Sequence, residues 1–113
     1  MNKKKLRILV VGVGSIGRRH IENFKNYTKN IEIVDISKSR IRECNKKFEF
    51  IKASYLSYKE AIEKNKYDAV LICTPPHKHL EIASLAAKNK IHSFIEKPLG
   101  MNVKGWDKVI KLN

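Results

Sequence analysis

A glycine motif, GVGSIG at residues 12–17, directly follows the apolar run LRILVV and opens a stretch with helical periodicity. This order of strand, glycine turn and helix is the context in which the pattern GxGxxG is typical of a dinucleotide-binding turn. Strand and helix must pack closely around such a turn. The motif therefore constrains the fold more than any other feature of the chain.

Each position of the motif has a physical reason. Gly12 permits the tight turn, Gly14 lacks a Cβ and lets a pyrophosphate approach the backbone, and Gly17 lets the helix pack against the strand. The helix N-terminus at Ser15 and Ile16 presents free N–H groups and a partial positive charge to an anion. The sequence predicts that these five residues contact a cofactor; a glycine turn without a ligand is the alternative.

Apolar runs of strand length alternate with helical patterns along the rest of the chain, as in βαβ units of a parallel sheet. Right-handed crossovers then predict an α/β fold, a doubly wound Rossmann sheet with strand order 3-2-1-4-5. The alternation Phe48-Glu49-Phe50 predicts that the third strand is a half-exposed edge strand. The predicted strands cover residues 6–12, 31–36, 48–53, 68–74 and 91–96, and the predicted helices cover residues 15–27, 39–47, 57–64, 77–89 and 103–112.

Length and charge limit the function classes. The 113 residues predict one domain over 1–113, and no apolar run approaches the roughly 18 residues of a membrane span. The net charge of +13 invites a nucleic-acid interpretation, but 19 of the 24 basic residues are Lys spread along the chain. Aromatic residues interleaved with Arg, which stack on bases, are absent from the sequence. We therefore expect neither a nucleic acid nor a membrane as partner.

The cysteines and the N-terminus indicate a compartment. Two cysteines 29 positions apart form no C-x-x-C pair and no disulfide framework, so a reducing cytoplasm is expected. The start MNKKKLRILVV superficially imitates a secretory signal, but Arg7 interrupts its short apolar stretch and no cleavage pattern follows. The prediction is a cytoplasmic protein.

An acidic residue, Asp35, ends the second predicted strand 18 positions after Gly17. This spacing is close to the roughly 20 residues at which an acid binds the ribose 2′-hydroxyl of the cofactor. A carboxylate there repels a 2′-phosphate and favours NAD. Ser37, Lys38 and Arg40 follow and could accept that phosphate, so NADP remains possible. A turn or helix-capping role is the structural alternative for Asp35.

Two further strand ends carry polar residues, in TPPHKH at residues 74–79 and EKP at residues 96–98. Ligands of open parallel sheets lie beyond the carboxyl ends of the strands, which predicts Thr74 and Pro75 beside the dinucleotide. Glu96 could accept a bond from a ribose, and Lys97 could take a proton from a substrate hydroxyl if desolvation keeps its amine neutral. A surface ion pair is the alternative. His77 and His79 lack further ligands at metal-binding spacing, so no metal is predicted.

Taken together, GVGSIGRRH, TPPHKH and EKP make the sequence resemble the Gfo/Idh/MocA family of oxidoreductases. The resemblance implies the dinucleotide-binding domain of an NAD(P)-dependent enzyme that acts at a carbinol carbon of a sugar, sugar derivative or polyol. It also implies that Lys97 is the catalytic lysine, that Glu96 contacts the nicotinamide side of the cofactor, and that Thr74, Pro75 and His79 line the cofactor cleft.

Two departures from the family pattern stand out. Lys90 occupies the place of a helix-ending glycine, so we expect Asn89 to take the left-handed conformation. The second α/β domain of the family, which supplies most of the substrate pocket, is not contained in the 113 residues. The chain alone is therefore expected to bind cofactor without turnover and to self-associate through an exposed sheet edge. An isolated nucleotide-binding module, or a Rossmann-like methyltransferase using S-adenosylmethionine, is the alternative function.

Overall fold

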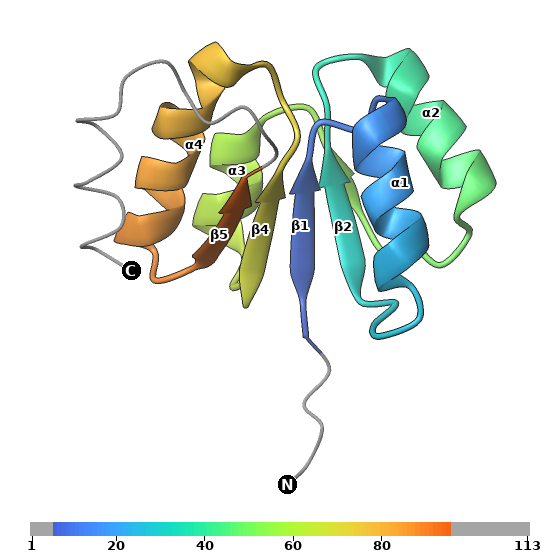
Figure 1. The fold of residues 1–113 in the computed structure, drawn as a ribbon, viewed down its shortest axis with the longest axis horizontal. Coiled ribbons are helices and arrows are strands. Elements are labelled where there is room, and N and C mark those ends of the chain that lie inside the picture. Colours follow the sequence, from blue (N-terminus) through green and yellow to red (C-terminus); the bar gives the residue numbers. More distant parts are fainter. Residues whose placement is uncertain (1–5, 96–113) are drawn as a thin grey trace, which may run out of the picture.

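The computed structural model describes residues 6–95, in which strands and helices alternate (Figure 1). Its strands are β1 (Ile8–Val11), β2 (Ile31–Val34), β3 (Ser54–Tyr55), β4 (Ala69–Ile72) and β5 (His92–Ile95). Its helices are α1 (Ser15–Phe24), α2 (Lys38–Lys47), α3 (Tyr58–Lys64) and α4 (Pro76–Lys88). The predicted helix over 103–112 and the predicted end of the fifth strand at Glu96 lie outside the described residues.

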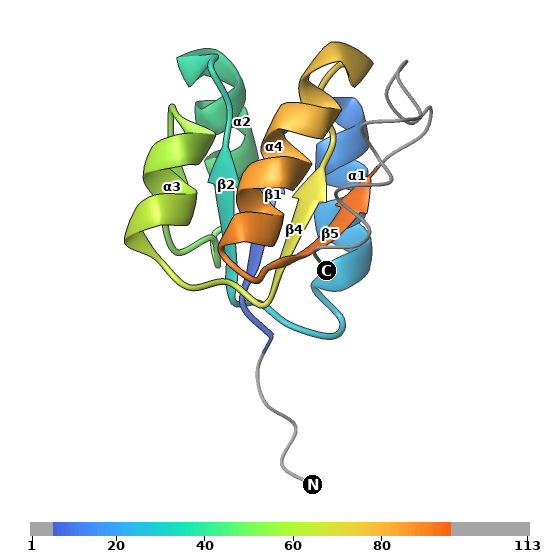
Figure 2. The same ribbon diagram turned by 90° about the vertical axis from the view of Figure 1, so that its left-hand side faces the viewer.

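All neighbouring strands pair in parallel, in the order β3-β2-β1-β4-β5, which confirms the predicted topology. Helices α1 and α2 cover one face of the sheet, and α3 and α4 cover the other (Figures 1 and 2). Val11, the last residue of β1, pairs with Val34 on one side and with Ile72 on the other. The residues that follow these three strands therefore meet at one edge of the sheet, where the strand order reverses.

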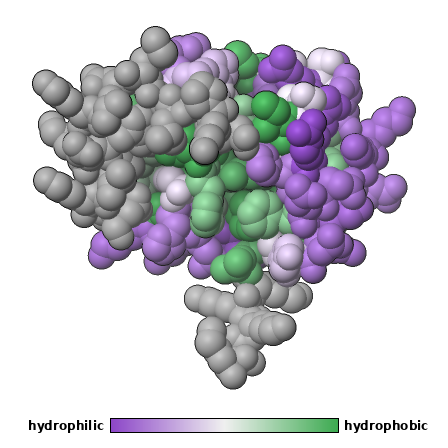
Figure 3. Space-filling model, viewed as in Figure 1, coloured by the Kyte–Doolittle hydropathy of each residue, from purple (hydrophilic) through white to green (hydrophobic). Residues whose placement is uncertain are grey.

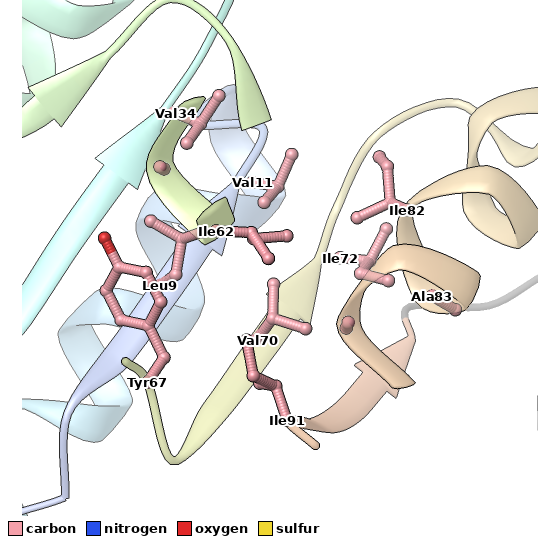
Figure 4. Packing of buried hydrophobic residues seen from close by; sticks show 12 residues of the cluster. Leu9, Val11, Val34, Ile62, Tyr67, Val70, Ile72, Ile82, Ala83 and Ile91 are labelled. Carbon is pink, nitrogen blue, oxygen red and sulfur yellow. The ribbon is translucent and has the colours of Figure 1, made fainter. Parts of the chain in front are cut away.

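Alternating side chains of the central strands build two hydrophobic layers. Leu9 and Val11 of β1 pack under α3 and α4 (Figure 4), whereas Ile8 and Val10 pack under α1 and α2. Because both faces are covered, β1 and β2 are buried along their whole length, as expected for a parallel sheet. These layers fix the central strands and hold the loops at their carboxyl ends in place.

The third strand lies further along the chain than the sequence indicates. It was predicted over residues 48–53, but β3 covers Ser54–Tyr55. Phe48 ends α2 and is 3% exposed, and its ring lies 5.8 Å from that of Phe50. Both side chains belong to the layer under α1 and α2. The alternation of aromatic and charged residues thus reflects packing beneath the end of a helix, and not strand pairing.

The end of α4 also differs from the prediction. Asn89 has φ −99°, and Lys90 takes the left-handed conformation with φ 59°. The amide of Lys90 donates to the Ala87 carbonyl and the amide of Ile91 donates to the Ala86 carbonyl, the two hydrogen bonds of a Schellman motif. Lysine therefore occupies the position that usually holds glycine. The turn keeps its geometry because its backbone bonds and the buried Ile91 hold it.

Part of the sheet surface remains apolar and accessible. Figure 3 shows apolar surface beside α1, and Phe94 of β5 is 56% exposed. Among residues 6–95, none of the helices is both long and apolar enough to cross a membrane. In the same range, no three His, Cys, Asp or Glu side chains are grouped so that they could hold a metal ion.

Candidate cofactor-binding site

The glycine turn sits at the carboxyl edge of the sheet, between β1 and α1. Gly12 has φ 94°, a conformation that L side chains rarely adopt, and its amide donates to the Val34 carbonyl at 2.8 Å. A Cβ at Gly12 would stand 2.9 Å from the carbonyl carbon and oxygen of Cys73. The turn therefore rests on the end of β4, and only glycine fits there.

Gly14 differs from the other glycines of the motif, because a Cβ placed on it would meet no atom of residues 6–95 within 4 Å. Gly14 is also the N-cap of α1, and no side chain caps that helix start in the described part of the chain. Ser15 and Ile16 follow and are exposed. The first amides of α1 thus border open space, which fits the approach of an anionic group to the backbone.

Asp35 follows β2 and lies beside the glycine turn, with 5% of the residue exposed. Its Oδ2 accepts a hydrogen bond from the amide of Val13 at 2.9 Å, and its Oδ1 accepts one from the amide of Ser37 at 2.8 Å. A carboxylate has about four acceptor positions, so capacity remains for a ribose hydroxyl. Asp35 therefore has a structural role in the turn, as the alternative predicted, and its carboxylate keeps acceptor capacity for a ligand.

Arg40 lies in the first turn of α2, with its Nη1 4.0 Å from Asp35 Oδ2. Its side chain is 59% exposed, so this ion pair is screened by solvent and weak. Ser37 caps the helix by accepting a hydrogen bond from the Arg40 amide at 3.2 Å. The guanidinium is therefore held near Asp35, yet it is free to turn toward an anion.

The loop after β4 brings Thr74 and Pro75 to the same edge. The Thr74 amide lies 3.1 Å from the Cβ position of Gly12, so the two loops touch. The Thr74 Oγ1 is buried and has no hydrogen-bond partner among the described residues. A buried hydroxyl without a partner in a loop that touches the glycine turn fits a site that takes a polar ligand.

His79 lies below this loop rather than on its surface, because the residue is only 1% exposed. Its Nε2 is hydrogen-bonded to the Thr74 carbonyl. A carbonyl oxygen only accepts, so Nε2 carries a hydrogen and donates it. The imidazole thus supports the loop that presents Thr74 and Pro75.

The structure brings the glycine turn, Asp35, Arg40 and Thr74 together, whereas Glu96 and Lys97 lie outside the described residues. Two residues near the turn were missed. The buried amide of Val13 binds Asp35, and no sequence pattern reveals that bond. Ile36 is 89% exposed directly after Asp35. The sequence signal that could have found Ile36 is an apolar residue placed between a strand and a helix, where neither β2 nor α2 covers it.

A hollow also lies at the opposite edge of the sheet, lined by Arg7, Lys29, Glu32 and Lys52 among others. The Glu32 carboxylate is 2.7 Å from Arg7 Nη2 and accepts a 2.7 Å hydrogen bond from the Tyr67 hydroxyl. Its buried acceptors are therefore already engaged within the chain. We assign no ligand to this hollow, which is remote from the glycine turn.

A parallel sheet of this order with a glycine turn at its switch point defines a dinucleotide-binding Rossmann domain. The profile of the Gfo/Idh/MocA family, described as "Oxidoreductase family, NAD-binding Rossmann fold", matches residues 6–113. The chain belongs to this family, which confirms the resemblance and the predicted cofactor class.

Several proteins similar in sequence are named as dehydrogenases. Myo-inositol 2-dehydrogenase of Thermotoga maritima is 40% identical over 108 residues, which is 94% of this chain and 32% of the relative. The crystal structure of a probable dehydrogenase from Thermotoga maritima has a TM-score of 0.85 and 38% identity, covering 95% of this chain and 32% of that one. Scyllo-inositol dehydrogenase from Lactobacillus casei with bound NAD(H) and scyllo-inositol shares the fold, with a TM-score of 0.83 and 20% identity over 96% of this chain and 33% of that one. The chain spans about a third of these relatives.

Proposed function

We propose that this chain is the cofactor-binding part of an enzyme that transfers hydride between a nicotinamide cofactor and a carbinol carbon of a polyol or sugar. The likeness to myo-inositol 2-dehydrogenase, at 40% identity, supports an inositol-like polyol as the substrate class. The chain covers 32% of that relative. For this reason we expect the chain alone to bind cofactor without turnover.

One observation carries the proposal: the open flank of Gly14 beside the uncapped start of α1. In our proposal the amides of Ser15, Ile16 and Gly17 donate to the pyrophosphate. Gly12 supplies the turn that aims them there. A helix start binds an anion through such amides and through its partial positive charge.

Asp35 and Arg40 are proposed to set the choice between NAD and NADP. The buried carboxylate favours the 2′-hydroxyl of NAD, and Arg40 provides the positive charge that a 2′-phosphate needs. The variant Asp35→Ala is expected to raise the affinity for NADPH relative to NADH. An unchanged ratio of the two affinities would count against a ribose contact.

The remaining assignments concern the nicotinamide end of the site. Thr74, Pro75 and His79 are proposed to form one wall of the cofactor cleft. The buried imidazole of His79 contributes by supporting the loop that carries the other two residues. Glu96 is proposed to contact the nicotinamide side, and Lys97 to accept at Nζ the proton of the substrate hydroxyl. The bound nicotinamide supplies the hydride acceptor.

Binding to the 113-residue chain tests the cofactor assignment. Trp106 fluorescence and calorimetry with NADH, NADPH and S-adenosylmethionine should give saturable binding of NADH, weaker binding of NADPH and none of S-adenosylmethionine. Binding of S-adenosylmethionine without either dinucleotide would contradict the proposal in favour of the methyltransferase alternative.

The role of Lys97 needs a polypeptide of the full length of the relatives. There, Lys97→Ala is expected to abolish hydride transfer while NADH affinity stays within a few-fold of the parent, because a proton acceptor is lost and the phosphate contacts remain. A fully active variant would remove Lys97 from the mechanism.

Location and assembly are proposed on separate observations. Cys44 and Cys73 do not form a disulfide with each other, which suits a reducing cytoplasm. The 56% exposed Phe94 on β5 supports self-association through that side of the sheet. Sedimentation of the 113-residue chain should show a concentration-dependent dimer that Phe94→Ser weakens, and a monomer at all concentrations would exclude it.

A further inference from the structure

The carboxylate of Asp35 joins two loops of the candidate site. Its Oδ2 accepts the Val13 amide at 2.9 Å, and its Oδ1 accepts the Ser37 amide at 2.8 Å. Val13 lies in the turn after β1, and Ser37 caps α2 after β2. One side chain therefore ties together the glycine turn and the loop in which the ribose-binding acid is expected.

The burial of this carboxylate needs compensation. Only 5% of Asp35 is exposed, and removing a carboxylate from water is costly unless hydrogen bonds or charges replace the lost hydration. Two amide donors and the nearby Arg40, at 4.0 Å, supply that compensation. A solvent-facing ribose contact would not need the side chain to be this deep.

The hydrogen bond to Val13 lies next to Gly12, whose backbone takes a positive φ that favours glycine. Gly12 holds φ 94°, and its amide is bound to the Val34 carbonyl at 2.8 Å. The next amide, that of Val13, is bound to Asp35. Two consecutive amides are thus fixed to β2 and its end. The following residue, Gly14, begins the open flank where a Cβ would meet nothing within 4 Å in the part of the chain that the structure describes.

We propose that Asp35 is a positioning residue for the pyrophosphate, which it serves through the Val13 amide in addition to any ribose contact of its own. The inference rests on the proposed function, in which the glycine turn takes the pyrophosphate. Without the Asp35 carboxylate, the turn is less ordered before the anion binds. Part of the binding free energy is then consumed in ordering the turn, and the affinity for the anion falls. Loss of Asp35 then weakens every phosphate ligand of the turn, whether or not that ligand carries a ribose.

Inorganic pyrophosphate is the probe that separates the two roles, because it has no ribose. It is titrated into the 113-residue chain at constant ionic strength, since a net charge of +13 attracts anions without specificity. Amide chemical shifts of residues 12–17 report binding, and hydrogen exchange of the Val13 amide reports the Asp35 bond in the free protein. We expect Asp35→Ala to lose Val13 protection and to bind pyrophosphate about tenfold more weakly, as for loss of a hydrogen bond to a charged group.

A second substitution keeps the test independent of folding. Asp35→Asn has the same shape but one acceptor oxygen, so it can retain only one of the two amide bonds. Across the wild type and both variants, pyrophosphate affinity should follow the protection of Val13. The matched control is Thr28→Val, near the opposite end of β2, which also removes a buried side-chain acceptor of a backbone amide. The Thr28 hydroxyl accepts a hydrogen bond from the Asn30 amide at 3.0 Å and donates one to the Leu6 carbonyl at 2.8 Å. This control should bind pyrophosphate within twofold of the wild type.

The outcomes distinguish this inference from the proposed function. If Val13 loses protection while pyrophosphate affinity stays unchanged and NADH affinity falls, Asp35 is a ribose contact only and the inference is overturned. A wild-type chain that binds NADH but shows no pyrophosphate effect at residues 12–17 overturns it as well. A wild-type chain that binds neither dinucleotide overturns the proposed function instead.

Discussion

Gly17 of α1 lies directly against the carbonyl oxygen of Gly12. A Cβ built on Gly17 would overlap that oxygen and stand 3.6 Å from Val10 Cγ1 in β1. The overlapping atom belongs to the backbone, so no side-chain rotation relieves the clash. The contact sets the closest approach between α1 and the glycine turn, and thereby the position of the helix amides at the candidate site.

The variant Gly17→Ala should therefore be destabilised by roughly 3 kcal/mol or more, because α1 must move away from a buried turn. Thermal and urea unfolding of the 113-residue chain measure this loss. Circular dichroism of the folded fraction checks that the α/β fold persists. A variant as stable as the wild type would show that the helix shifts without cost.

Gly14→Ala is the matched substitution within the same motif. Gly14 has φ −70°, which any residue adopts, and its Cβ would meet no atom of the described residues within 4 Å. Stability should stay within about 1 kcal/mol of the wild type, because the poorer N-cap and the stiffer unfolded chain oppose each other. NADH affinity should fall by about tenfold or more, because the new methyl group occupies the flank where phosphate meets the backbone. Calorimetry with NADH beside a melting curve separates the two effects, and unaltered affinity would remove Gly14 from the site.

Lys90→Gly should stabilise the chain. Lys90 holds φ 59°, a conformation that costs an L-residue roughly 1–2 kcal/mol. Glycine removes this strain from the folded state, but its greater conformational freedom in the unfolded state offsets part of the stabilisation. The net effect is expected to be about 1 kcal/mol, or a rise in Tm of about 4 °C. The control is Asn89→Gly, at φ −99°, which should be destabilising because it removes the hydrogen bond from Asn89 Nδ2 to the Leu85 carbonyl. A lower Tm for Lys90→Gly would contradict the argument.

The same turn illustrates where sequence reasoning ends. The sequence shows that Lys90 stands where glycine usually ends the helix. Whether Asn89 or Lys90 takes the left-handed conformation depends on the residue at which the helix ends. Ile91 settles that residue, because its side chain is 1% exposed and its amide must reach the Ala86 carbonyl. Tertiary packing one residue later thus overrides the local preference of asparagine.

Sheet topology was predictable because β1, β2 and β4 are apolar runs whose lengths and spacing allow few alternatives. The short β3 was misplaced, because Phe48 and Phe50 imitate a strand while they pack beneath α2. At the site, the glycine spacing predicted the turn. The burial of Asp35 and its bond to Val13 depend on how two loops meet in space, which spacing along the chain does not encode.

Two thiols with different surroundings provide a prediction about pH. Cys44 is fully buried, and burial raises the pKa of its thiol to about 11. Cys73 is half-buried after β4. Because the thiolate is the reactive form, a thiol reagent at pH 8 should modify Cys73 first and reach Cys44 only when the chain unfolds. Mass spectrometry of the modified chain with time identifies the residue that reacts.

The raised pKa of Cys44 also links stability to alkaline pH. The unfolded thiol ionises near its ordinary pKa of 9.0, and the folded one only near 11, so the folded state holds the proton longer. The contribution of Cys44 to the free energy of unfolding is complete below pH 9 and is lost as the pH rises toward 11. This contribution is at most roughly 2.5 kcal/mol. Urea unfolding of wild type and Cys44→Ala between pH 8 and 11 isolates this component. The substitution costs packing energy equally at every pH, so only the slopes differ, and parallel curves would show that Cys44 titrates alike in both states.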